Sequence, residues 1–479
     1  MNDISKKEFQ DICNQLSRIK TETQTVEVKT AQGGTPEKLY DTFSSFSNQD
    51  QGGLIIFGID ERKEFEQVGV TKPAELQKHI SEKGLAMEPV VRPDIQIFEQ
   101  NGNVLVSAKI HGIEYDQRPC YYKARGKEKG SYIRVGDSDE HMTSLEIYNY
   151  EAYKKRIRND TRTIEDQVFI DQRKLDHYLS RKKAQRTNLA QLEEEQIYEL
   201  LHVKKDGKFT LSALLMFGIY PQAVFPQLSL TAVKIPGTQY GQNGISGERF
   251  LDNKKIEGTL EEMLEGGLNF VISNSRTKTV INKKTGVRED IYEYPVVAVR
   301  EALLNALVHR DYSSYTENMP VQIRMFDNRL EIHSPGGLYG TLTVEQLGTT
   351  QPDTRNPALV TMMETVNLTE NRYSGIPTIR KEMKDAKLPE PEFENKRGTF
   401  IVSLFNDKMS RNQINDTLRS VLEFCEIPRS KKEISEKMGI KTESYVKRTY
   451  IDPLLEKGLL EMTIPAKPGS RKQKYQKAE

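Results

Sequence analysis

The sequence predicts an α+β protein built from two or three domains. A chain of 479 residues is too long for a single hydrophobic core. Helices with an apolar stripe and short apolar strands follow one another along the chain. Hydrophobic residues at 36% and charged residues at 29% describe a globular protein with a strongly solvated surface. We expect domains at residues 1–156, 157–405 and 406–479.

Charge and cysteine content restrict the classes of partner and compartment. The net charge of +1 gives no overall field toward nucleic acid, so such contact depends on local patches. The three cysteines are far apart and odd in number, which favours neither a disulfide framework nor a zinc site and indicates a reducing cytoplasm. The N-terminus is polar, and the most apolar run, residues 211–225, is too short to cross a bilayer. We expect a cytoplasmic protein without a membrane partner.

The first segment alternates helix and strand. The spacing predicts a helix over residues 6–19 and a strand at TVEVK, residues 25–29. Thr35 has the character of a helix N-cap, with Pro36 at the first helical position. The run LIIFGID, residues 54–60, is nearly continuous in apolar residues, as in a strand buried on both faces.

This pattern, together with RPCYYKARGKEKGSYIRVGDS at residues 118–138, resembles the Schlafen-type AlbA-like domain. The resemblance covers about 130 residues and implies an AlbA-like fold. In many members this domain is taken to bind DNA or RNA, and in some it is a metal-dependent endoribonuclease built on three carboxylates. Both functions therefore follow as expectations for this segment.

The nuclease carboxylates map by this resemblance onto Glu22, Glu27 and Asp60. Three such oxygen ligands at one point would hold Mg²⁺ or Mn²⁺, and the ion would activate water against a phosphodiester. The alternative is that Glu27 pairs with Lys29 and that Asp60 caps a turn, because carboxylates at strand ends often do so.

Basic residues of this segment predict a contact with nucleic acid. Cations neutralise phosphates, and exposed tyrosines such as Tyr121, Tyr122 and Tyr132 can stack on unpaired bases. Alternatively, these residues form a solvated hairpin whose tyrosines pack inward. The cations expected at phosphates are Lys29, Arg118, Lys123, Arg125, Lys127, Lys129 and Arg134.

An apolar helix in YPVVAVREALLNALVHRDY, residues 294–312, places Glu301, Asn305 and His309 on one face. Glu301 could orient water as a general base, and Asn305 could ligate Mg²⁺ through its carbonyl oxygen. The alternative is an amphipathic helix with a polar edge. Residues 321–338, VQIRMFDNRLEIHSPGGL, predict two alternating strands and a Pro-Gly-Gly break.

This helix resembles the N-box helix of the GHKL (Bergerat-fold) ATPases, in the variant of bacterial RecG-like C-terminal proteins. Further matches are SPGGL, TRNPALV, NRYSGIPTIRKEM and RGTFIVSLF, which start at residues 334, 354, 371 and 397. The resemblance implies a Bergerat-type α/β sandwich that takes ATP and Mg²⁺. Ser334 and Pro335 replace the loop that carries the adenine-reading aspartate, and the phosphate-covering loop has only one glycine. The nucleotide-binding residues implied are Glu301, Asn305, Gly336, Gly337, Gly375 and Thr399.

The last segment, from about residue 410, resembles a winged helix: three helices and a Pro/Gly-rich hairpin. Its cations suit duplex DNA at a groove and the flanking phosphates. Many winged helices instead bind proteins. The cations expected at DNA are Lys447 and Arg448 on the third helix and Arg471 and Lys472 in the wing, near Lys441, Thr442, Ser444 and Lys467.

Three functions remain open from the sequence. The first is a nucleic-acid-binding transcriptional regulator in which the nucleotide in the central domain changes the affinity for DNA or RNA. The second is a Schlafen-like endoribonuclease that acts on transfer RNA or another RNA in defence or stress. The third is an assembly protein that forms a defined homo-oligomer without metal or nucleotide. Whether the chain is an enzyme stays open.

Overall fold

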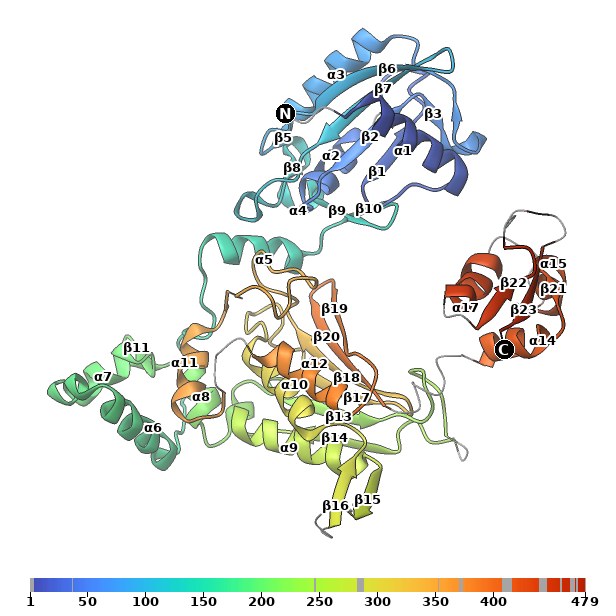
Figure 1. The fold of residues 1–479 in the computed structure, drawn as a ribbon. Coiled ribbons are helices and arrows are strands. Elements are labelled where there is room, and N and C mark those ends of the chain that lie inside the picture. Colours follow the sequence, from blue (N-terminus) through green and yellow to red (C-terminus); the bar gives the residue numbers. More distant parts are fainter. Residues whose placement is uncertain are drawn as a thin grey trace.

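The computed structural model describes residues 4–36, 38–244, 247–281, 288–351, 353–369, 374–406, 416–438, 446–456, 459–465, 470 and 473–478. It shows a mixed α+β protein, as the sequence predicts (Figure 1). None of the helices within these ranges combines the length and the apolar character that a bilayer crossing requires.

The first segment folds around a four-stranded sheet in the order β1-β2-β7-β6 (Figure 1). β1 runs parallel to β2, and the other neighbours are antiparallel. Every residue of β2 is buried, which confirms the strand expected to be covered on both faces. One face packs against α1 (Lys6–Ile19) and the other against α2 (Leu39–Ser47). The strands are β1 (Val26–Lys29), β2 (Gly53–Phe57), β6 (Asp94–Gln100) and β7 (Asn103–Ile110).

Helix α2 begins later than the sequence predicts. Its first residue is Leu39, so Thr35 and Pro36 lie outside the helix. The hydroxyl of Thr35 shares a hydrogen bond of 2.9 Å with Nδ1 of His79 on α3 (Pro73–Leu85). Because that long-range partner occupies the hydroxyl, it does not cap the helix.

Asn48, at the C-terminal end of α2, binds the backbone of two later segments, at Cys120 and at Tyr132. Asn48 donates through Nδ2 to the carbonyls of Cys120 and Tyr132 at 2.9 and 3.1 Å, and its Oδ1 accepts from the Cys120 amide at 2.7 Å. This clamp fixes the strands that carry the basic loop. The elements of this region are β3 (Ile59–Asp60), β4 (Glu66–Gln67), β5 (Met87–Glu88), β8 (Tyr121–Tyr122), α4 (Gly126–Gly130), β9 (Tyr132–Val135) and β10 (Ser138–His141).

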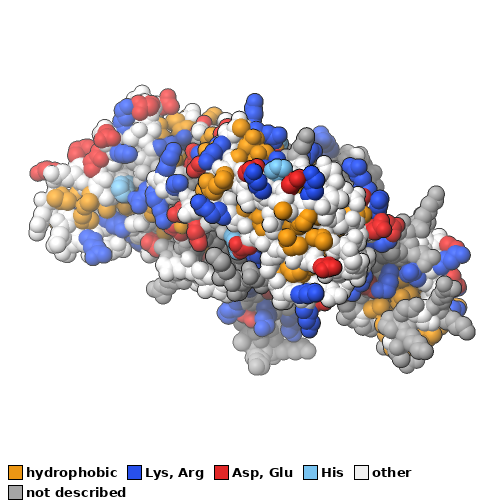
Figure 2. All heavy atoms as spheres, turned by 90° about the horizontal axis from the view of Figure 1, so that it is seen from above, with side chains coloured by type: hydrophobic (Ala, Val, Ile, Leu, Met, Phe, Trp, Pro, Cys, Tyr) orange, Lys and Arg blue, Asp and Glu red, His pale blue; other side chains and the backbone are white. Residues whose placement is uncertain are grey.

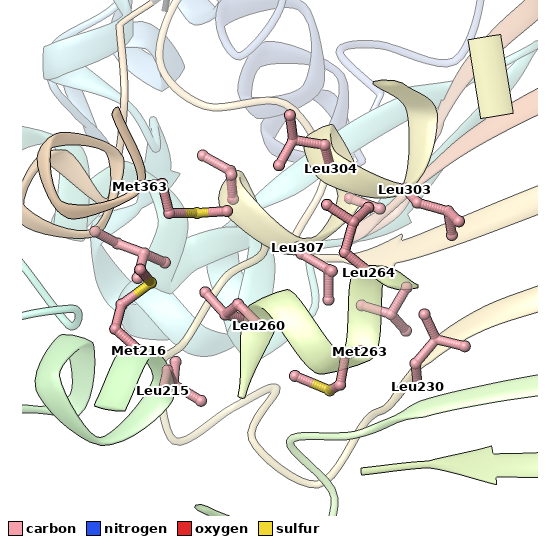
Figure 3. Close-up of a cluster of buried hydrophobic side chains, with 14 of the residues drawn as sticks. Leu215, Met216, Leu230, Leu260, Met263, Leu264, Leu303, Leu304, Leu307 and Met363 are labelled. Carbon is pink, nitrogen blue, oxygen red and sulfur yellow. The ribbon is translucent and has the colours of Figure 1, made fainter. Parts of the chain in front are cut away.

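The central segment is a two-layer α/β sandwich. Its six-stranded sheet has the order β14-β13-β17-β18-β20-β19, with only β13 and β17 parallel. The apolar side chains of one face pack against α9 (Leu260–Asn274), α10 (Val296–Val308) and α12 (Gly375–Asp385), and Figure 3 shows part of this core. The strands are β13 (Leu230–Lys234), β14 (Asp252–Ile256), β17 (Val321–Met325), β18 (Arg329–Pro335), β19 (Glu392–Lys396) and β20 (Thr399–Phe405).

Helices at the edge of this sandwich extend the same core. α8 (Leu211–Phe217) is buried along its whole length, and α6 (Gln172–Gln185), α7 (Glu194–Leu200) and α11 (Pro357–Thr365) add to it. Asp160 accepts hydrogen bonds from the amides of Ala358 and Leu359, the second and third residues of α11. The remaining elements are β11 (Lys204–Lys205), β12 (Lys208–Phe209) and the hairpin of β15 (Thr277–Ile281) and β16 (Arg288–Tyr292).

The last segment has its own core. Val421, Ile434, Val446 and Leu454 are buried together, as the apolar ladder in the sequence predicts. Three short strands form a sheet in the order β21-β23-β22. The described elements are α14 (Asp416–Phe424), β21 (Arg429–Ser430), α15 (Lys431–Lys437), a π-helical turn at Lys447–Ile451, α17 (Asp452–Glu456), β22 (Leu460–Met462) and β23 (Lys474–Lys477).

Candidate functional site

A cavity of about 500 Å³ lies over helix α10 of the central sandwich. This volume is within the range of protein sites for small molecules and cofactors. One part of its wall is apolar, and the rest carries a small set of polar groups. The apolar wall includes Leu304, Val308, Leu338, Leu347, Ile376 and Phe400, and the polar groups include Arg300, Glu301, Asn305, His309, Asp353 and Arg355.

Glu301 and Asn305 meet the start of α12 at this cavity. A methyl group built on Gly375 would lie 2.5 Å from Oε1 of Glu301 and 2.7 Å from Nδ2 of Asn305. The two side chains therefore converge on a place that only glycine leaves open. A carboxylate and a carboxamide oxygen are hard ligands of the type that Mg²⁺ takes beside phosphate oxygens. The residues present fit a magnesium nucleotide.

Two of the residues expected at the nucleotide support the wall without lining it. Gly336 has φ +115°, and its carbonyl accepts a hydrogen bond of 2.9 Å from Arg355. Thr399 pairs in the sheet with Pro335 and Lys396. Of the predicted set, Glu301, Asn305, Gly337 and Gly375 line the cavity, whereas the described surroundings of the cavity do not include Gly336 or Thr399.

At Ser334 and Pro335, where the family has the loop with the adenine-reading aspartate, the backbone is held by other hydrogen bonds. The hydroxyl of Ser334 donates to the carbonyl of Ala306 on α10 at 2.8 Å. Arg355 donates to the carbonyls of Gly336 and Gly337, both at 2.9 Å, and lies 3.7 Å from Asp311. The Pro-Gly-Gly break is therefore held by a buried arginine that the sequence analysis did not single out. Its only sequence signal was a position in TRNPALV.

Helix α5 (Ser144–Lys154) contacts the outer wall of the cavity from the N-terminal side. The ring of Tyr153 packs edge-on against Tyr339 with 5.4 Å between centroids, and a methyl group on Gly340 would lie 2.7 Å from it. Arg156 pairs with Asp353 at 2.7 Å. Tyr339 and Asp353 both line the cavity. The end of the N-terminal segment, residues 144–156, is thus in contact with the wall of the central cavity.

The structure also gathers carboxylates in the first domain, around a cation. Nη2 of Arg134 lies 2.7 Å from Glu27 and 3.3 Å from Glu22, and Nη1 lies 3.0 Å from Asp139. The arginine side chain is 1% exposed. Asp139 also accepts hydrogen bonds from Thr42 at 2.7 Å and Ser45 at 2.5 Å. The guanidinium occupies the space between the acids that a metal ion would need.

The described structure does not bring Asp60 together with Glu22 and Glu27 as a metal site. Gly58 has φ +99° and ends β2, and Asp60 continues into β3, which pairs with β4. Its carboxylate accepts from the amide of Arg62 at 3.0 Å and so caps a turn. Within the described chain no three acids, histidines or cysteines are arranged to hold a metal ion. Lys29 pairs with Glu27, as the alternative interpretation had it.

Comparison with known families matches each of the three segments. The model "Schlafen, AlbA_2" matches residues 22–143, and "Putative ATP-dependent DNA helicase recG C-terminal" matches residues 318–404. "Filamentation induced by cAMP protein Fic-like, C-terminal domain" matches residues 406–477. The chain carries a Schlafen AlbA_2 domain followed by a RecG C-terminal-type domain. The expected winged helix and its DNA contact stay predictions for the Fic-like C-terminal domain.

Two solved structures match the chain, one over most of its length and one over its first part. The DIP2311 protein from Corynebacterium diphtheriae is 18% identical, with a TM-score of 0.38, over 91% of this chain and 88% of that one. The N-terminal domain of a "Putative ATP-dependent DNA Helicase RecG-related Protein" from Nitrosomonas europaea is 23% identical, with a TM-score of 0.23, over 28% and 92%. No curated protein matches the chain.

Within the AlbA_2 domain, most of the predicted phosphate-binding cations are neutralised. Figure 2 shows Lys and Arg side chains interspersed with Asp and Glu on the face seen from above. Arg118 and Arg134 are buried, so they cannot reach a phosphate. Tyr122 stacks on Tyr40 with 3.8 Å between centroids, and Tyr132 is buried, so the tyrosines pack inward. The pairs are Arg118–Asp50, Lys123–Glu88, Arg125–Asp41 and Lys127–Glu151.

The basic loop is therefore not the free cationic surface that the sequence indicates. Its cations pair with acids from other parts of the chain. The local sequence alone therefore overstated the positive charge of the loop. Lys123, Arg125 and Lys129 are still exposed to solvent. In the C-terminal domain, Lys447 pairs with Asp452 at 2.9 Å. The side chain of Arg448, and Lys441, Thr442, Ser444, Lys467, Arg471 and Lys472, lie outside the described residues.

The two buried glutamates of the AlbA_2 domain titrate in opposite directions. Burial, reinforced by the neighbouring Glu27 carboxyl, raises the pKa of Glu22 to about 8. Burial also acts to raise the pKa of Glu27, but the hydrogen bond with Glu22 and the charges of Lys29 and Arg134 lower it overall. Near neutral pH, Glu22 is protonated and Glu27 is ionised. Asp139, missed in the sequence, supplies the second negative charge beside Arg134.

We expect the stability of the AlbA_2 domain to fall as pH rises from about 4.5 to about 8. Glu22 holds a proton in the folded state up to a pKa of about 8, whereas the unfolded chain loses it near 4.5. The stabilisation that the protonated Glu22 gives to the folded domain is therefore fully present below pH 4.5, the pKa of the unfolded chain, and is lost as the pH rises through about 8. The free energy of unfolding should fall by at most about 1.4 kcal/mol per pH unit in this range. Urea denaturation across this range, compared with Glu22→Gln, measures the slope. An equal slope in both proteins contradicts the assignment.

Proposed function

We propose that this protein is a nucleic-acid-binding transcriptional regulator whose affinity for nucleic acid responds to a nucleotide in the RecG-type domain. The combination of a Schlafen AlbA_2 domain with a domain of the RecG helicase type supports the association with nucleic acid. The cavity beside Glu301, Asn305 and Gly375 supports binding of ATP with Mg²⁺. Bound Mg²⁺ would neutralise phosphate charge there.

The exposed cations of the AlbA_2 domain are the ones that can contact phosphates. Lys123 and Arg125 are 46% and 51% exposed, and their partners Glu88 and Asp41 belong to the same domain. A polyanion can replace such partners because exposed ion pairs contribute little to stability. Lys129 is exposed as well. The predicted cations of the C-terminal domain complete the proposed contact. Arg134 lies between Glu22, Glu27 and Asp139, so these acids do not support a metal-dependent ribonuclease.

The contact between α5 and the cavity wall carries the regulatory part of the proposal. Tyr153 and Arg156 follow the AlbA_2 domain in the chain and contact Tyr339 and Asp353, which line the cavity. We expect a ligand that moves this wall to change its contacts with α5 and Arg156. Arg397 of the RecG-type domain pairs in addition with Glu140 of β10, on the same hairpin as the buried Arg134. Two contacts thus connect the central domain with the AlbA_2 domain.

Filter binding of labelled DNA and RNA, with and without ATP and Mg²⁺, tests this function. We expect ATP to change the affinity by at least fivefold, the lower end of typical coupling between sites. In Tyr153→Ala/Arg156→Ala this effect should fall below about twofold, while nucleic acid still binds. Lys154→Ala, on an exposed position of the same helix, serves as the control and should keep the wild-type response. Equal affinities with and without ATP in the wild type contradict the regulatory function.

A further inference from the structure

The sheet of the AlbA_2 domain ends at β6, whose outer side has no neighbouring strand within the described residues. The sheet order β1-β2-β7-β6 places this strand of seven residues outermost (Figure 1). It joins β7 through residues 101–102, which both have positive φ, as in a two-residue type I′ turn. The residues on either side of such a turn form a hydrogen-bonded pair, and this pairing alternates along the two strands. Ile95, Ile97 and Glu99 therefore direct their backbone N–H and C=O groups away from β7.

This outer edge of β6 is open to another strand. In the described ranges of the chain, the backbone groups of Ile95, Ile97 and Glu99 take part in no hydrogen bond on that side. Ile97, at the centre of the strand, is 49% exposed. The strand sequence DIQIFEQ contains neither lysine nor proline, which commonly protect edge strands. A long edge with an exposed apolar residue at its centre is a template for strand pairing.

The outer strands of the six-stranded sheet, in contrast, are protected by charge. The central residue of β14 is Lys254, and the central residue of β19 is Glu394. Antiparallel pairing of either strand with its own copy about that residue would place two like charges directly opposite each other, which is destabilising. At the other edge of the AlbA_2 sheet, β1 has four residues, too few for an extended pairing. Of the outer strands in these two sheets, β6 is thus the one suited to a partner strand.

We propose that two copies of this chain associate through β6, in an antiparallel pair centred on Ile97. A second copy fits this edge because the strand is complementary to itself in that register. Ile97 meets Ile97 of the partner subunit, and Ile95 meets Glu99 of the partner subunit, so the open backbone groups satisfy one another. Asp94 meets Gln100 of the partner subunit, and no like charges are opposite. The two sheets become one across a two-fold axis, the commonest symmetry of homo-oligomers.

Sedimentation velocity of the full chain over a range of concentrations, without nucleotide or nucleic acid, tests the proposal. We expect a monomer–dimer equilibrium whose Kd rises at least about tenfold in Ile97→Lys, because two lysines would then lie opposite each other at the axis. Ile97 is half exposed, so the monomer can keep its fold. Ile219→Lys, at another exposed isoleucine outside β6, is the matched control and should leave the Kd unchanged.

Cysteine cross-linking tests the register of the pair. Ile97→Cys would place two cysteines with their Cα atoms about 5.5 Å apart, within reach of a short bis-maleimide. Glu99→Cys would place them about 13 Å apart along the strands, because four residues separate them at about 3.3 Å each. All three native cysteines are buried, so the introduced cysteine should react first. We expect covalent dimers from Ile97→Cys and few from Glu99→Cys.

Three outcomes would overturn the proposal. The first is wild-type protein that stays monomeric at every concentration. The second is a dimer that Ile97→Lys leaves intact, and the third is equal cross-linking of Ile97→Cys and Glu99→Cys, since either would mean that another surface joins the copies. If Ile97→Lys does not fold, the two cysteine variants decide. The inference rests on neither the nucleotide nor nucleic acid, so its failure would leave the proposed function unchanged.

Discussion

Arg134→Ala is expected to destabilise the AlbA_2 domain by about 3–5 kcal/mol, the cost of removing one partner from a buried ion pair. The side chain is 1% exposed and contacts Glu22, Glu27 and Asp139. Without it, these acids remain buried, and only Glu27 among them has a second cationic partner given by the described contacts, Lys29. Hydrogen exchange of the β1 and β2 amides in the full chain measures the loss for this domain separately from the others.

Two comparisons make the Arg134 prediction specific. Lys78→Ala removes an exposed ion pair of α3, where the lysine is 75% exposed, and should cost under about 1 kcal/mol. Arg134→Met/Glu27→Gln removes a positive and a negative charge together and should lose less than Arg134→Ala alone. A loss below about 1 kcal/mol in Arg134→Ala would mean that the acids do not depend on the arginine.

Gly375→Ala is expected to weaken magnesium-nucleotide binding more than about tenfold with little change in stability. The added methyl group would overlap the ends of the Glu301 and Asn305 side chains, at 2.5 and 2.7 Å. Those ends are flexible, so the fold can yield, but the atoms that yield are the proposed ligands of phosphate and Mg²⁺. Alanine also favours the helix over glycine by up to about 1 kcal/mol, which offsets part of the strain.

Calorimetry with ATP and Mg²⁺ measures this loss, which we expect to exceed tenfold in Kd, or about 1.4 kcal/mol. Gly33→Ala is a matched control, because a methyl group there meets nothing within 4 Å and the backbone is not strained. Unchanged affinity in Gly375→Ala would show that the nucleotide does not use the junction of α10 and α12.

Local patterns predicted the elements that carry the central cavity. The 3.6-residue period of residues 294–312 predicted α10, and the structure places Glu301, Asn305 and His309 along the cavity, as one helix face requires. The alternating pattern after residue 320 likewise predicted β17 and β18. These helices and strands depend on residues only a few positions apart, so local sequence patterns are enough to predict them.

The ionic contacts could not be predicted in this way because they join distant parts of the chain. Arg134 is 112 residues from Glu22, and no spacing rule connects them. Asp60 follows an apolar strand directly, yet the positive φ of Gly58 takes it into a different pairing. The resemblance to nuclease members predicted Asp60 as a ligand from its position in the sequence. Its place in the structure depends on the direction that the chain takes after Gly58.

Asp160 has a consequence for how the protein can be divided. Its carboxylate, in a residue that is 1% exposed, accepts two amides at the start of α11, nearly 200 positions away in sequence. Cleavage in the chain after residue 160 would leave that helix end without its acceptor unless the fragments stayed associated. We therefore expect residues 160–406 to behave as one folding unit. A protease that nicks between α6 and α7 should produce pieces that still migrate together under native conditions.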